Sequence, residues 1–201
     1  MNGRVDIMRQ EMQDVLEKNI LQFWLDKMID HENGGFYGRI DGSGQLHPEA
    51  EKGAILNARI LWSFSAAYRV MGKPEYLEAA TRAKDYIIDH FVDEEFGGVY
   101  WSVDCKGNPL DTKKQFYAIG FAIYGLSEYA RATGDREALD YALNLYECIE
   151  EHAKGADTKT AEVKAAVGKK AYFVVKAYYF SKNSDKNLFS KASSKFMLEM
   201  K

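Results

Sequence analysis

Apolar residues along this chain recur three and four positions apart, in five segments separated by short polar connections. This spacing places apolar side chains on one face of a helix, so each segment is predicted to be helical. Gly72 and Gly134 suit the position just after a helix, Pro74 suits a first helical turn, and Asp135 suits an N-cap. With these limits, the predicted helices cover residues 7–28, 51–70, 75–91, 113–132 and 136–152.

Two shorter stretches alternate between apolar and polar residues and begin with a pair of glycines. They read GGFYGRID at residues 34–41 and GGVYWSVD at residues 97–104. Strict alternation is typical of strands, and the following DGSG and DCKG are typical turn sequences. Each stretch is therefore predicted to form a small β-hairpin arm.

The arms and the helices that follow them form an internal repeat. The arms match at an offset of 63 residues, as in Gly34 and Gly97, and the helices match at 62, as in Lys52 and Lys114. In each unit the first helix is the more apolar and the second carries one apolar stripe. Helix pairs in tandem predict a toroid or solenoid with an apolar inner layer and an amphipathic outer layer. The arms would then rim one mouth, at the N-terminal ends of the inner helices.

Composition narrows the possible partners. The net charge of −3 argues against a nucleic-acid partner. The sequence contains no run of about 18 apolar residues, so no membrane span is predicted. The N-terminus has no apolar signal segment, and Cys105 and Cys148 lack metal-ligand spacing, so we expect two reduced thiols in a cytoplasmic protein. Aromatic residues make up 13% of the chain, which suits packed helices and also carbohydrate clefts.

One charged residue interrupts the first inner helix. Arg59 lies at the edge of its apolar stripe, where an unpaired buried charge would be costly. Its guanidinium is expected to reach water, to pair with a carboxylate, or to face a wet pocket. The stripe comprises Ile55, Ala58, Leu61, Trp62, Ser65 and Ala66.

Long motifs in the first 152 residues resemble the N-acylglucosamine 2-epimerase superfamily, and within it the cellobiose 2-epimerase branch. The resemblance implies an all-α fold, here a partial (α/α)6 barrel with short β-hairpin arms at one mouth, and a reaction that needs no metal or nucleotide cofactor. The matching motifs are NGGFYGRID (33–41), EKGAILNARILWSFSAAYR (51–69), GGVYWSVDCKGNPLDTKKQFYAIGFAIYGLSEYA (97–130) and TGD (133–135).

The resemblance also implies a chemistry and two substrate-binding residues. Family members invert C2 of a reducing sugar after ring opening, through a cis-enediolate, with histidines of later inner helices as base and acid. By motif position, Arg59 in NARILW and Tyr117 in KKQFYAIGFA would hold the sugar near O1 and O2. A guanidinium suits an enediolate because it stays charged and offers a fork of donors. Without the resemblance, Tyr117 is expected to be core filler with a satisfied hydroxyl.

The pattern breaks near Lys154. Residues 156–201 carry ten Lys against four Asp and Glu, a net of +6, whereas residues 1–155 have a net of −9. We therefore expect an N-terminal barrel half at 1–154 and a divergent basic tail at 155–201. Three explanations stay open for the tail: a frame-shifted or misassembled end, a shortened paralogue with a new tail, or a diverged continuation of the barrel. Within it, 171–180 is predicted to be a strand or short helix, and 181–201 to be loosely ordered.

No histidine follows position 152, and no catalytic or metal-binding residue is predicted in this chain. His31 and His47 fall in the arm loops, whereas His90 and His152 end outer helices.

The pair Asp93 and Glu94 is predicted to be loop charge rather than an acid–base dyad. A truncated, inactive epimerase-like chain is thus the first hypothesis, with a reducing disaccharide or other sugar as partner. The alternatives are a non-catalytic sugar-binding or helical interaction module, or an enzyme of the N-acylglucosamine 2-epimerase or mannose isomerase type. The open barrel edge predicts self-association, because apolar inner-helix side chains would reach it.

Overall fold

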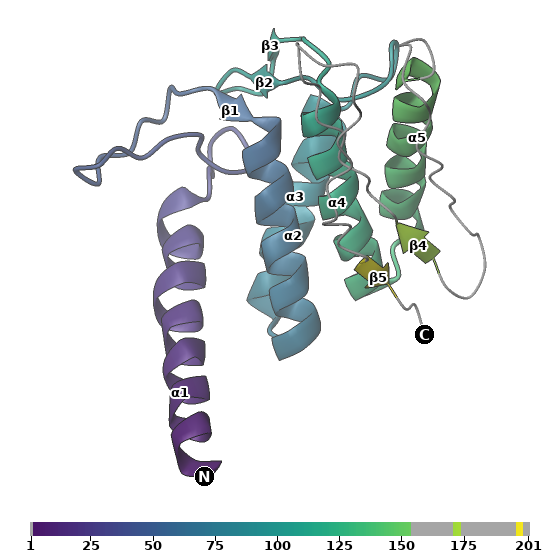
Figure 1. Cartoon of the computed structure of the whole chain (residues 1–201). Helices are drawn as coiled ribbons and strands as arrows, with labels where there is room; N and C mark the ends of the chain where they lie inside the picture. The colour runs from purple at the N-terminus through teal and green to yellow at the C-terminus, as the bar shows by residue number, and fades with distance from the viewer. Residues whose placement is uncertain (1, 154–170, 174–195, 199–201) are drawn as a thin grey trace, which may run out of the picture. The chain divides into compact units, whose positions relative to one another are not determined.

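The computed structural model describes residues 2–153, 171–173 and 196–198 (Figure 1). The chain divides into two compact units, Met1–His152 and Ala153–Lys201, and each is taken by itself. The predicted tail at 155–201 lies largely outside the described residues.

All five predicted helices are present in the first unit. They are α1 (Asn2–Val15, continued by the π-helical turns η1, Leu16–Leu21, and η2, Trp24–Met28), α2 (Ala54–Met71), α3 (Pro74–Tyr86, continued by η3, Ile87–Phe91), α4 (Phe116–Thr133) and α5 (Arg136–Ala153).

The predicted helix limits are confirmed at four positions. Gly72 and Gly134 adopt left-handed backbone conformations, and their N–H groups donate to carbonyls four residues earlier, at 2.7 and 2.8 Å. Pro74 occupies the first turn of α3, and the Asp135 carboxylate accepts from the Ala138 N–H at 2.9 Å. Both inner helices begin about three residues later than predicted, because Lys52 and Gly53 belong to a strand and Gln115 is extended.

The arms form a small antiparallel sheet in the order β1 (Lys52–Gly53), β2 (Ser102–Val103) and β3 (Pro109–Asp111). The second arm is the predicted hairpin, formed by β2 and β3, whereas the first closes with a single bridge between Ile40 and Leu46. Strand β1, which leads into α2, pairs with the second arm. The sheet lies at the end where α2 and α4 begin, as predicted for the rim of a mouth (Figure 1).

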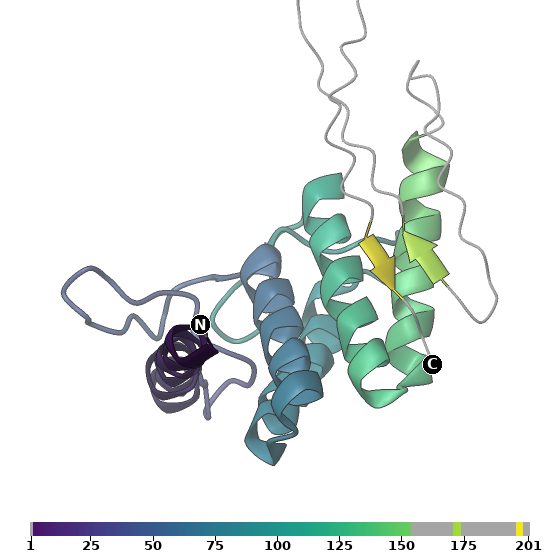
Figure 2. The same ribbon diagram turned by 60° about the horizontal axis from the view of Figure 1, so that its bottom comes forward.

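The core forms between the inner helices and their outer partner. Helix α2 packs against both α3 and α4, and the two inner helices run side by side (Figure 2). Their approach is close at Gly125, where an added Cβ would lie 2.7 Å from the Ala58 carbonyl oxygen. The predicted apolar stripe of α3 is buried at each of its members, Tyr76, Ala79, Ala80, Ala83, Tyr86 and Ile87.

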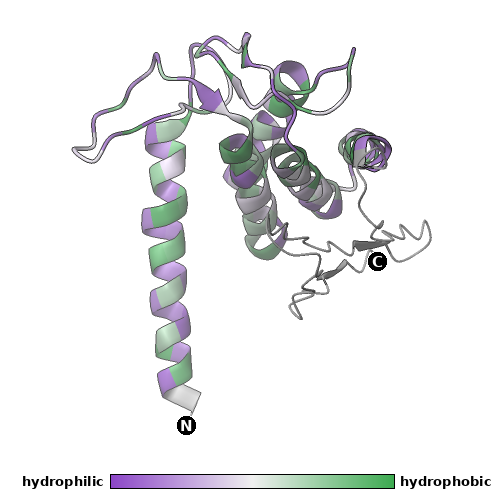
Figure 3. Cartoon of the chain, turned by 45° about the horizontal axis from the view of Figure 1, so that its top comes forward, coloured by the Kyte–Doolittle hydropathy of each residue, from purple (hydrophilic) through white to green (hydrophobic). Residues whose placement is uncertain are grey.

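Helix α1 carries hydrophobic and hydrophilic residues along its whole length (Figure 3), and most of its apolar side chains are exposed. Leu21 at its far end is buried, and Trp24 is half-buried against the core. On the inner helices, Phe116 and Tyr124 are exposed, whereas Ile60 and Phe64 are buried. The exposed apolar residues of α1 and η1 are Val5, Ile7, Met8, Met12, Val15, Leu16 and Ile20.

In the second unit the structure describes two short strands. Strand β4 (Ala171–Phe173) pairs antiparallel with β5 (Phe196–Leu198). The strand alternative for 171–180 therefore holds for its first three residues, and β5 lies in the stretch predicted to be loosely ordered. None of the helices described is long and apolar enough to cross a membrane.

Candidate functional site

Arg59 stands on the outward side of an otherwise buried stretch of α2. Its neighbours Ala58 and Ile60 are buried, whereas Arg59 is exposed. No carboxylate within the described part of the chain forms an ion pair with it. The guanidinium acts electrostatically on the hydroxyl of Tyr124 on α4, whose pKa is raised by burial and by Glu128 and lowered in part by Arg59. Arg59 is therefore a solvent-facing cation beside the neighbouring inner helix.

Tyr117 also faces solvent, one residue into α4. Its side chain is 62% exposed, so the expectation of a buried core tyrosine is wrong. Its ring contacts Phe121 edge-on, with centroids 5.0 Å apart. Arg59 and Tyr117 share no hydrogen bond in the part of the chain that the structure describes.

Three aromatic rings link these two predicted residues. Trp62 of α2 stacks on Tyr124 of α4, with centroids 4.9 Å apart and planes within 9°. Phe121 lies edge-on to Tyr124 at 6.2 Å. We call Arg59, Trp62, Tyr117, Phe121 and Tyr124 the aromatic wall; it carries one cation and two phenolic hydroxyls on one surface of α2 and α4.

The four histidines lie away from this wall. His47 donates to Asp41 at 3.0 Å in the first arm, and His31 is exposed in a loop. His90 donates to the Gly107 carbonyl at 3.1 Å, and His152 donates to the Cys148 carbonyl at 2.8 Å. None of the four lies on α2 or α4, in agreement with their predicted positions.

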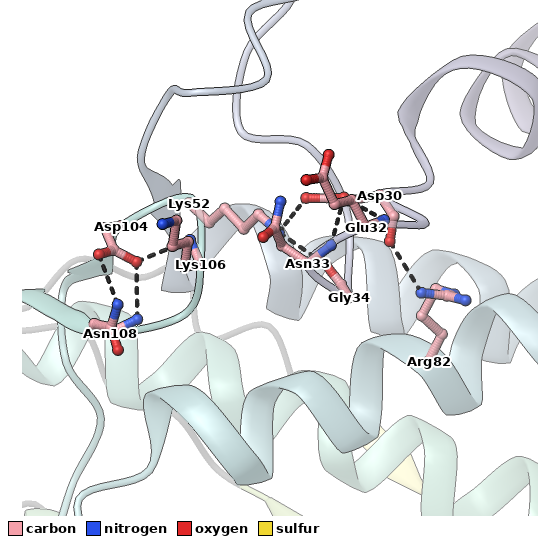
Figure 4. A network of polar contacts seen from close by, with 9 residues as sticks. All are labelled: Asp30, Glu32, Asn33, Gly34, Lys52, Arg82, Asp104, Lys106 and Asn108. Atoms are coloured by element: carbon pink, nitrogen blue, oxygen red, sulfur yellow. Dashed lines mark hydrogen bonds and ion pairs between the residues drawn. The ribbon is translucent and has the colours of Figure 1, made fainter.

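A buried ion pair joins the first arm to the start of α2 (Figure 4). The Lys52 ammonium lies 2.7 Å from the Asp30 carboxylate, and both side chains are fully buried. Lys52 also donates to the Gly34 carbonyl at 2.7 Å, and Asp30 accepts from the N–H groups of Glu32 and Asn33. Burial raises the pKa of Asp30, but Lys52 and the two N–H groups outweigh it, so that the pKa is lowered overall.

The second arm repeats the same pair. Lys114 lies 2.5 Å from Asp93, which accepts from the N–H groups of Glu95 and Phe96. Asp93 is thus a loop charge, as predicted, but it is buried and paired with a cation. Glu94 instead accepts from the Tyr141 hydroxyl at 2.9 Å, so the two carboxylates have separate partners.

Sequence reasoning missed both ion pairs and the Trp62–Tyr124 stack. The repeat carried a signal for the pairs, since Asp30 and Asp93 match at the arm offset and Lys52 and Lys114 at the helix offset. It carried none for the stack, because Trp62 and Tyr124 fit the apolar stripes of their own helices.

Comparison with known proteins identifies the family. The sequence profile of N-acylglucosamine 2-epimerase (GlcNAc 2-epimerase) matches residues 35–178, and the chain belongs to this family.

Cellobiose 2-epimerase of Bacteroides fragilis is 65% identical over 148 residues, which are 74% of this chain and 38% of that enzyme. The enzyme of Ruminococcus albus is 47% identical over 146 residues, or 73% of this chain and 37% of that enzyme. The solved structure of cellobiose 2-epimerase from Bacillus thermoamylovorans B4167 matches with a TM-score of 0.70 and 46% identity, covering 72% of this chain and 37% of that one. The chain thus spans well under half the length of these relatives.

Proposed function

We propose that residues 1–152 form the substrate-binding part of a sugar 2-epimerase that acts on the reducing end of β-1,4-linked disaccharides. The observation that carries the proposal is the exposed Arg59 on the same surface as Tyr117, at the end of the inner helices where the arms lie. High identity to cellobiose 2-epimerases favours a disaccharide over the monosaccharide substrates of more distant family members.

In this proposal the wall binds the opened sugar and steadies the charge that develops on it. Removal of the C2 proton leaves an enediolate with negative charge on oxygen. The Arg59 guanidinium supplies fixed positive charge and donors for this oxygen, and the Tyr117 hydroxyl supplies another donor. Proton transfer at C2 needs a base and an acid, for which the family resemblance implies histidines of later inner helices.

The 201-residue chain alone is therefore expected to bind the sugar without epimerising it. Isothermal titration with cellobiose should give saturable binding, and Arg59→Gln should weaken it about tenfold because a charge-assisted hydrogen bond is lost. No deuterium should enter C2 from D2O, since the four histidines lie off the inner helices.

Two results would contradict this proposal. One is unchanged cellobiose affinity in Arg59→Gln, with Arg39→Gln, an arginine of the first arm, as the matched control. The other is deuterium incorporation at C2 by the chain alone, which would require an acid and a base other than the family's histidines.

We also propose that the chain self-associates through its exposed apolar surface. The apolar side chains of α1 and η1 form a continuous series at three- and four-residue spacing from Val5 to Ile20, and contiguous exposed patches drive association. Light scattering after size exclusion should show species larger than a monomer, shifted toward monomer by Met12→Lys. A monomer that persists at high concentration would refute this.

A further inference from the structure

The Trp62–Tyr124 stack has an unusual position for two large aromatic side chains. It joins the two inner helices, with ring planes within 9° of parallel, yet Tyr124 is 43% exposed and Trp62 only half-buried. Side chains that serve only the core are covered, as are Leu61 and Leu126 on the same helices. Each ring covers one face of the other, and the parts of the pair that remain exposed are open to a ligand.

We propose that the stacked pair Trp62 and Tyr124 is a stacking subsite for a closed pyranose ring of the disaccharide. This inference rests on the proposed function and adds the residues that hold the sugar ring itself, whereas Arg59 and Tyr117 hold the oxygens at the reducing end. A β-linked glucose ring has equatorial hydroxyls and presents C–H groups on both faces. Such a face fits the electron-rich face of an aromatic ring.

The helix geometry sets the subsite beside the predicted oxygen-binding residues. Trp62 lies three residues after Arg59 on α2, about 4.5 Å farther along the axis, and Tyr124 lies seven residues after Tyr117 on α4, about 10 Å farther. Phe121 fills the space between the two tyrosines with edge-on contacts to both. A sugar ring placed on the stack therefore lies within about one sugar length of Arg59. The Arg59 guanidinium and the tyrosine hydroxyls can then form hydrogen bonds with the substituents of that sugar.

Ligand sites generally combine apolar and aromatic lining with a few polar groups that fix orientation, and the aromatic wall has this composition. A surface that packs against an apolar protein helix would bury such an unpaired charge at a cost. Arg59 is exposed beside the stack and acts on Tyr124 electrostatically, which favours a small polar ligand over an apolar helix.

The test uses the full chain labelled with 5-fluorotryptophan, whose three tryptophans give three fluorine NMR signals. The probe ligand is methyl β-cellobioside, which has closed rings and no free reducing end. The Trp62 signal, assigned with Trp62→Phe, should shift saturably, whereas the Trp24 and Trp101 signals should stay in place. No shift at Trp62 would overturn the inference.

A substitution separates stacking from general binding. Tyr124→Leu keeps an apolar side chain but removes the ring, and should weaken methyl β-cellobioside binding about fivefold. Phe96→Leu is the matched control, because Phe96 is an exposed aromatic residue of the second arm, and it should leave the affinity unchanged. Equal affinity in Tyr124→Leu and the parent chain would overturn the inference; if that variant fails to fold, the Trp62 shift in the parent chain decides alone.

The two proposals fail in different ways. If the Trp62 signal responds but Arg59→Gln leaves cellobiose affinity unchanged, the stacking subsite stands and the proposed function falls. If cellobiose binding depends on Arg59 but the Trp62 fluorine signal shifts with neither cellobiose nor methyl β-cellobioside, the proposed function stands and the stacking subsite falls. A Trp62→Phe variant that changes the oligomeric state without any response to sugar would assign the surface to a second copy of the chain, against the inference.

Discussion

The two arms hold the same Asp–Lys pair in two different settings. Asp30 and Lys52 are fully buried, whereas Lys114 of the second pair is 28% exposed and Asp93 is 7% exposed. The helix offset matches Tyr86 of the first unit to Cys148 of the second. Lys52 lies 4.7 Å from the centre of the Tyr86 ring, but Lys114 lies over Tyr100 of its own arm.

The glycines of the arms show that Tyr86 and Cys148 occupy equivalent places. A Cβ added at Gly34 would lie 3.4 Å from the Tyr86 ring, and one added at Gly97 would lie 3.3 Å from the Cys148 sulfur. The smaller cysteine leaves the second pair open to water. We infer that the same Asp–Lys motif stabilises its arm to different degrees, depending on the side chain that the outer helix places beside it.

The largest expected difference follows from removing each lysine in turn. Lys52→Met leaves a buried, unpaired carboxylate and should lower the free energy of unfolding by about 3–5 kcal/mol. Lys114→Met should cost about 1–2 kcal/mol, because Lys114 is 28% exposed and water can take its place beside Asp93. Urea denaturation followed by circular dichroism measures both. Lys113→Met is the matched control and should be near neutral, since Lys113 is exposed.

If Lys52→Met and Lys114→Met lower the free energy of unfolding equally, the difference in burial between the two pairs has no effect on stability. A larger cost for Lys114→Met than for Lys52→Met would reverse it.

Removing the covering ring should make the first pair resemble the second. Tyr86→Cys empties space above Lys52 and should cost about 3 kcal/mol by itself. In that background Lys52→Met should cost less than in the parent chain, because water then reaches Asp30. A double-mutant cycle measures this coupling. Strictly additive costs would show that Tyr86 does not seal the pair.

Acid should weaken both arms, with a smaller effect. The pKa values of Asp30 and Asp93 are lowered in the folded chain, so the stability they provide is present above about pH 4 and is lost as the pH falls through their folded-state values. The urea midpoint should therefore fall as the pH is lowered below about 4. In Lys52→Met the acid-induced fall should be smaller, because Asp30 then lacks the cation that helps to lower its pKa. A midpoint independent of pH in this range would contradict the lowered values.

The fold was largely predictable because its signals are local and repeated. Helical periodicity, the glycines at 72 and 134 and the repeat of the arms each depend on nearby residues, and the structure follows them closely. The late start of α2 was not predictable in this way, because Lys52 is held by Asp30, twenty-two residues earlier. Such pairing is set by the path of the arm rather than by any local pattern.

The candidate site was predictable only in part. Arg59 is conspicuous as a charge on an apolar helix, and the structure exposes it. Tyr117 was selected by resemblance alone, since an aromatic residue on an apolar helix is normally buried. Tyr124 and Trp62 carried no distinguishing signal, because only the packing of α2 beside α4 brings their rings together.

A chimera tests most directly the proposal that the α2–α4 surface binds the substrate of a sugar 2-epimerase. Residues 1–152 would replace the matching 65%-identical part of the Bacteroides fragilis cellobiose 2-epimerase, and deuterium entry at C2 of cellobiose would be followed by NMR in D2O. We expect exchange by the chimera, and a loss of about a hundredfold or more in Arg59→Gln. A folded chimera that exchanges equally well with and without Arg59 would contradict it.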